Sequence, residues 1–118
     1  MKFGLTEATI KKINQVFKNH SEIDRAVIYG SRAKGNYKLG SDIDLTLYGE
    51  NLSYKLLGKL LDELDDVLLP YTFDLSIFEK IDNKNLRDHI ERVGLVFYKR
   101  KLTDSIDIGS PLFNNRRL

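Results

Sequence analysis

Hydrophobic residues recur along the chain at two spacings, one typical of helices and the other typical of strands. A spacing of three or four residues predicts a helix over 6–19, with Thr6 as its N-cap. The same spacing predicts a helix over 53–67 and another that Asp82 caps and Gly94 ends. Alternating or β-branched runs predict strands at 25–30, 42–48, 71–78 and 95–98, and residues 31–34 are expected to form a short helical turn.

This order of elements predicts an α/β fold, a single domain with a mixed sheet of about four strands and helices packed mainly on one face. The expected domain covers residues 1–98. Residues 99–118 show no hydrophobic period and hold five Lys and Arg against two Asp, so we expect a basic tail, either flexible or docked on a partner. The leucine stripe of residues 56–64 is interpreted either as core packing or as a docking surface.

The composition excludes several classes of protein. With no cysteine and only two histidines, neither a disulfide framework nor a structural zinc site is expected. No apolar run approaches the roughly 20 residues that span a membrane, and the first residues lack the features of a secretion signal, so we expect a cytoplasmic protein. A net charge of +2 is too small to indicate a nucleic-acid-binding protein.

Acidic residues mark the polar sides of two predicted strands. Side chains alternate between the faces of a strand, so Asp42 and Asp44 share one face while Ile43 lies on the other. Asp74 occupies the centre of the polar side of the strand over 71–78. If the two strands are neighbours, the carboxylates form one cluster, in which two charges about 5 Å apart repel by about 3 kcal/mol. Protonation, an arginine or a divalent cation would relieve this repulsion.

The types of residue in this cluster favour a divalent cation. Carboxylate oxygens without His or Cys are ligands for a hard ion, Mg²⁺ or Mn²⁺, and Mg²⁺ usually completes its shell with water and substrate phosphate. The simpler interpretation of two aspartates one residue apart is a solvated strand edge. An EF-hand is not expected, because the Gly and the distal Glu that it requires are absent after Asp44.

The Gly30–Ser31 turn follows the first predicted strand. A helix start presents free N–H groups to an anion, and a glycine lets a phosphate approach the backbone closely. The alternative is a structural strand-to-helix junction. Arg32, Lys34 and Lys38 either meet phosphates or are simply solvated, and the glycines and Lys-Ser/Thr ending of a Walker A loop are absent.

Together, "GSRAKG" and "SDIDL" give the pattern Gly-Ser, ten residues, Asp-x-Asp, followed by an acid in a later strand. This resembles the signature of the nucleotidyltransferase superfamily that includes DNA polymerase β, and most closely that of its minimal nucleotidyltransferases. The motifs span residues 28–78. The resemblance implies a nucleotidyltransferase fold and a metal-dependent enzyme that uses a nucleoside triphosphate.

The resemblance also implies roles for individual residues. Gly30 and Ser31 would hold the triphosphate of the nucleotide, expected to be ATP. Two Mg²⁺ ions, or Mn²⁺ in their place, would bind Asp42 and Asp44, and Asp74 would complete the site for the ion that activates the attacking hydroxyl. The candidate catalytic and metal-binding residues are therefore Asp42, Asp44 and Asp74, and the candidate nucleotide-binding residues are Gly30, Ser31, Arg32 and Ser41.

Small members of this family resemble antitoxins that pair with helical HEPN-type ribonucleases. The resemblance implies transfer of AMP to a hydroxyl of such a partner, which is expected to come from the adjacent gene. A homo-oligomer or a hetero-oligomer is expected. Two alternatives stay open. In the first, the acceptor is a small molecule or an RNA end. In the second, the chain is a non-catalytic antitoxin that acts by binding alone.

Overall fold

The computed structural model describes residues 1–101, and the expected tail beyond Lys101 lies outside the described residues. No helix in this part of the chain is both long and apolar enough to cross a membrane. A 3-10 turn, Phe78–Lys80, follows the third strand. The helices and strands of residues 1–101 are α1 (Glu7–Lys18), β1 (Arg25–Tyr29), α2 (Ser31–Lys34), β2 (Ile43–Tyr48), α3 (Tyr54–Asp66), β3 (Phe73–Ile77), α4 (Lys84–Val93) and β4 (Leu95–Lys99).

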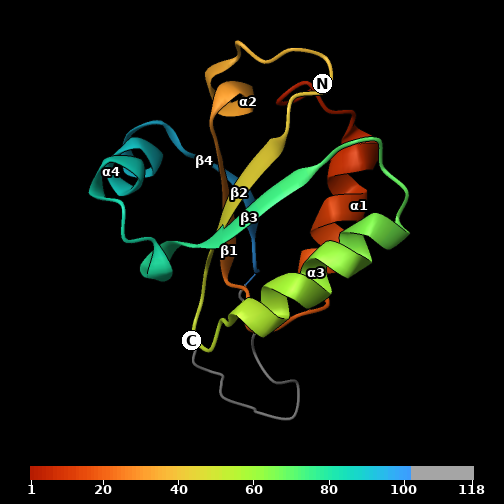
Figure 1. Cartoon of the computed structure of the whole chain (residues 1–118). Helices are drawn as coiled ribbons and strands as arrows, with labels where there is room; N and C mark the ends of the chain where they lie inside the picture. The colour runs from red at the N-terminus through yellow and green to blue at the C-terminus, as the bar shows by residue number, and fades with distance from the viewer. Residues whose placement is uncertain (102–118) are drawn as a thin grey trace, which may run out of the picture.

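The strands form one mixed sheet in the order β3-β2-β1-β4 (Figure 1). β1 runs antiparallel to both β2 and β4, whereas β2 and β3 are parallel and are connected through α3. A parallel pair requires such a crossover, because its two strands start at the same end of the sheet. The prediction of an α/β domain with a mixed four-stranded sheet is confirmed.

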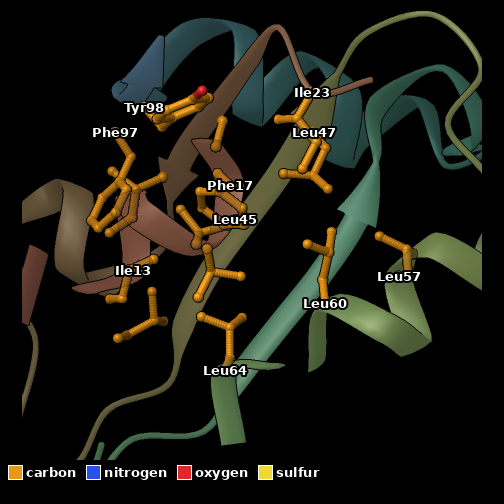
Figure 2. Packing of buried hydrophobic residues seen from close by; sticks show 14 of the residues in the cluster. Ile13, Phe17, Ile23, Leu45, Leu47, Leu57, Leu60, Leu64, Phe97 and Tyr98 are labelled. Carbon is orange, nitrogen blue, oxygen red and sulfur yellow. The ribbon is translucent and has the colours of Figure 1, made fainter. Parts of the chain in front are cut away.

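One face of the sheet carries the main hydrophobic core beneath α1 and α3. Alternate residues of the strands point into it, as in β2, where Ile43, Leu45 and Leu47 are fully buried. Figure 2 shows Leu45 and Leu47 packed with side chains of both helices. Four leucines of the predicted stripe belong to this core, so core packing is its main role, while Leu61 is 40% exposed.

The opposite face is covered in part by α4, which Figure 1 shows on the other side of the sheet from α1 and α3. Val27 and Tyr29 of β1 pack there against Ile90 of α4. The expectation that the helices lie mainly on one face therefore holds for α1 and α3 and is wrong for α4. This arrangement leaves the polar residues of β2 and β3 on a face that is only partly covered.

Side chains cap the helices in the usual way, and one of the two predicted N-caps is wrong. The side chain of Thr6 accepts a hydrogen bond from the amide of Thr9, as predicted. The cap of α4 is Asn83, whose side chain accepts from Leu86, and not Asp82. The two residues are adjacent and both are good caps, so the sequence alone does not separate them.

The end of β4 is tied to the body of the domain. Arg100 donates hydrogen bonds to the carbonyls of Lys18, His20 and Ile23, and its amide donates to the carbonyl of Asp24. Cations near the end of a helix satisfy carbonyls that have no partner within the helix. Arg100, which the sequence places in the basic tail, thus caps the segment that follows α1.

Candidate active site

The polar face of the sheet brings two of the predicted acidic residues together. Asp44 of β2 and Asp74 of β3 are register partners in the parallel pair, and neighbouring strands lie about 4.8 Å apart. Thr46 and Ser76 form the next pair along the same face. The parallel register therefore fixes two carboxylates side by side, which alternation within each strand alone does not establish.

Asp42 lies just before the first residue of β2, and Thr72 lies just before the first residue of β3, at the same end of the sheet. The hydroxyl of Thr72 donates a hydrogen bond to Asp42, and the carbonyl of Thr72 accepts from the amide of Ile43. The ladder between the strands thus continues one residue beyond their ends. Asp42 and Asp74 are exposed, whereas Asp44 is half-buried.

Burial and charge repulsion both act on Asp44. Burial raises the pKa of the Asp44 carboxyl above its usual range, and the negative charges of Asp74 and then Asp42 raise it further. Within residues 1–101, the ion pairs are Lys11 with Glu7 and His20 with Glu63, so no cationic side chain forms an ion pair with these three aspartates. The arginine that would relieve the repulsion is absent from the described structure.

Tyr29 is a further residue of this face that the sequence analysis did not single out. It is the β1 partner of Asp44 and is buried, and its ring meets His89 of α4 edge to face at 6.5 Å. Burial raises the pKa of Tyr29, and the charges of Asp74 and Asp44 act in the same direction. The one signal for Tyr29 is its place in a strand next to β2. That signal becomes useful only when the antiparallel register of β1 and β2 is known.

Gly30 approaches the acidic pair more closely than any other residue type could. Its φ of +77° is in a region that L side chains rarely adopt, and a Cβ atom there would lie 2.5 Å from Oδ2 of Asp44. Gly30 is also the N-cap of α2, and Ser31 is its first helical residue. The first N–H groups of α2 consequently start beside the carboxylates.

The other two candidate nucleotide-binding residues are engaged within the loop that joins α2 to β2. The guanidinium of Arg32 is buried and donates to the carbonyls of Ser41 and Phe3. The hydroxyl of Ser41 accepts from the amide of Lys38. Lys34 and Lys38 are exposed on the same loop.

The donor set fits a hard divalent cation in its chemistry. All three side chains offer carboxylate oxygens, and their negative charge has no cationic partner within residues 1–101. As the side chains stand, no three acidic, imidazole or thiol groups in that range are close enough together to hold an ion. Asp42 and Asp74 are exposed, and the side chain of Asp42 is hydrogen-bonded to Thr72.

The family model for polymerase β nucleotidyltransferases matches residues 11–103, and the chain belongs to this family. The match includes the acidic residues and the Gly30–Ser31 turn. A comparison with curated protein sequences found no match.

Solved structures share the fold at low sequence identity. A chain from a toxin–antitoxin complex with AMP-PNP is 21% identical, with a TM-score of 0.63 over 85% of this chain and 78% of that one. A chain from the MntA–HepT toxin–antitoxin is 16% identical, with a TM-score of 0.61 over 84% and 77%. A chain from tri-AMPylated Shewanella oneidensis HEPN toxin in complex with MNT antitoxin is 17% identical, with a TM-score of 0.61 over 85% and 77%.

Substituting Gly30 tests whether its close approach to Asp44 matters. We expect Gly30→Ala to lose most nucleotidyl transfer and nucleotide binding, because the added methyl displaces the Asp44 carboxylate. Gly35→Ala is the matched control, since its φ is +86° and a Cβ there meets nothing within 4 Å. The backbone cost is about 1–2 kcal/mol for Gly35→Ala in the left-handed region and about 1–3 kcal/mol for Gly30→Ala, whose φ of 77° and ψ of −155° are typical of glycine, and thermal unfolding measures both. Equal loss of function in the two variants would contradict the role of Gly30.

Removing the charge of Asp44 should stabilise the fold at neutral pH. Since folding raises the pKa of Asp44, the folded chain binds this proton more tightly than the unfolded chain, and stability falls as the pH rises through the folded pKa. We expect Asp44→Asn to raise the melting temperature at pH 7 without divalent cations. The gain should disappear towards the ordinary pKa of 3.8. Asp65→Asn, on the exposed side of α3, is the control, and a lower melting temperature for Asp44→Asn at pH 7 would refute the repulsion.

Proposed function

We propose that the chain is a metal-dependent nucleotidyltransferase that moves AMP from ATP to a hydroxyl of a partner protein. The partner is a small helical HEPN-type protein from the adjacent gene, and the chain acts as its antitoxin in the cytoplasm. The observation that carries this proposal is the Asp44–Asp74 pair, which lacks a counter-cation within residues 1–101 and lies beside the Gly30 turn. Membership of the nucleotidyltransferase family supports the same chemistry.

The chemistry follows from the positions of the residues. Gly30 lets the backbone at the start of α2 lie close to the Asp44 carboxylate, and the amides at the start of this helix would be donors for phosphate oxygens. Asp42 and Asp44 would hold two Mg²⁺ ions, or Mn²⁺, and Asp74 would complete one of the two sites. When bound, such ions neutralise phosphate charge and lower the pKa of the acceptor hydroxyl. The acceptor oxygen then bonds to the α-phosphorus, the bond to the bridging oxygen of the β-phosphate breaks, and pyrophosphate leaves.

The accessibility of the carboxylates supports a macromolecular acceptor. Asp42 and Asp74 are exposed, so a side chain carried on another protein can reach them. A small-molecule acceptor is usually enclosed by its site over most of its surface. The structural relatives point the same way, since one holds AMP-PNP in a toxin–antitoxin complex and another contains an AMPylated HEPN toxin.

Labelled ATP tests the reaction and the acceptor together. The purified chain is mixed with Mg²⁺, the adjacent gene product and ATP labelled at either the α- or the γ-phosphate. We expect the α-label, and not the γ-label, on the partner protein, because adenylyl transfer retains only the α-phosphate. The substitution Asp42→Asn with Asp44→Asn should abolish labelling. Asp65→Asn with Asp66→Asn removes the same charge from an exposed part of α3 and should leave labelling unchanged.

Two results would contradict this function in different ways. Absence of α-label on the partner would remove the protein acceptor and leave a small molecule or an RNA end as candidates. Full neutralisation of the toxin by the Asp42→Asn and Asp44→Asn double variant would mean that binding alone is sufficient.

A further inference from the structure

We propose that Arg32 is a positioning residue that holds the nucleotide-binding loop in shape from inside the protein, and that it does not itself bind phosphate. The inference rests on the proposed function, since nucleotide binding is what the loop provides. It concerns the segment between Ser31 and Asp42, which separates the Gly-Ser turn from the first aspartate.

The burial of Arg32 is the first observation. Its side chain is 3% exposed, and among residues 1–101 it forms no ion pair with a carboxylate. A desolvated guanidinium needs partners for its N–H groups and its charge. A phosphate in solution has little access to a side chain that is covered to this extent.

Four residues from three segments of the chain contact this guanidinium. Nε donates to the carbonyl of Ser41 at 3.0 Å, and Nη1 donates to the carbonyl of Phe3 at 2.8 Å. The ring of Tyr37 lies 5.3 Å away and the ring of Tyr71 lies 5.0 Å away, both within the range of cation–π attraction. The partners of Arg32 are therefore carbonyls and aromatic faces of its own chain.

The hydrogen bond to Ser41 closes the loop at its base. Arg32 directly follows Ser31, and Ser41 directly precedes Asp42, so one contact joins the phosphate-binding end to the metal-binding end. The β1–β2 ladder, which pairs Tyr29 with Asp44, already holds the Gly30 turn beside the acidic residues, so the side chain of Arg32 sets the path of the loop between these two anchored ends. A loop held only at its ends would sample many paths, and ordering it when the nucleotide binds would cost free energy that the wild type does not spend.

The N-terminal segment fits tightly against the same group. A Cβ atom on Gly4 would lie 2.5 Å from Cε1 of Tyr37 and 3.0 Å from Nη1 of Arg32. The cations of this loop that are open to solvent are Lys34 and Lys38. A phosphate in solution has access to these two lysines, whereas Arg32 is covered.

Two substitutions separate positioning from direct contact. Arg32→Lys keeps the charge but loses the planar donor fork and the stacking on the rings. Tyr71→Leu leaves Arg32 in place and removes one of its aromatic partners. We expect each to weaken binding of AMP-PNP with Mg²⁺ about 10-fold or more in calorimetric titration, and to raise the KM for ATP more than it lowers kcat. We also expect the double variant to bind about as weakly as Arg32→Lys alone, because the two residues act as one unit.

Tyr54→Leu is the matched control, since the ring of Tyr54 contacts Lys80 at 5.5 Å on an exposed surface. It should bind AMP-PNP like the wild type. Wild-type affinity in both Arg32→Lys and Tyr71→Leu would overturn the proposal, as would loss of binding in Arg32→Lys with Tyr71→Leu unaffected. Tyr71→Leu alone decides the matter if Arg32→Lys does not fold. If the wild type itself fails to bind AMP-PNP with Mg²⁺, the proposed function is what fails.

Discussion

The parallel pairing of β2 with β3 is the constraint on which the rest of the site depends. It sets Asp44 beside Asp74 in register, and it also sets Asp42 beside Thr72 at the strand ends. The hydrophobic core on the other face maintains this pairing, because a slip of one residue would turn Ile43 and Leu45 away from α1 and α3. The free energy of core packing thus keeps the carboxylates of Asp44 and Asp74 side by side despite their repulsion.

Repulsion held in this way favours the binding of a cation, as the proposed function requires. The raised pKa of Asp44 shows that the folded chain opposes its negative charge, so a bound cation relieves an existing cost. The Gly30 turn places anion-binding amides next to the same carboxylates. An acidic cluster beside an anion site suits a ligand that carries both signs, as a nucleoside triphosphate with divalent ions does.

The sequence predicts well what depends on local pattern. The order of helices and strands and the mixed four-stranded sheet were predicted from local pattern and are confirmed. The sequence predicts poorly what depends on tertiary contacts. The side of the sheet that α4 covers, the meeting of Tyr29 with the acidic pair and the burial of Arg32 all require knowledge of which segments meet. An arginine in a loop rich in lysine and glycine is usually solvated, and only the contacts with Phe3 and Tyr71 show otherwise.

The central claim is that these carboxylates share divalent ions, and manganese binding tests it most directly. Free Mn²⁺ is followed by its electron paramagnetic resonance signal while the protein is added, with and without AMP-PNP. The account predicts that the wild type removes Mn²⁺ from solution, more strongly with the nucleotide analogue, and that Asp74→Asn and Asp44→Asn each weaken this uptake. Equal uptake by the wild type and both variants, or no uptake by the wild type with the analogue present, would contradict it.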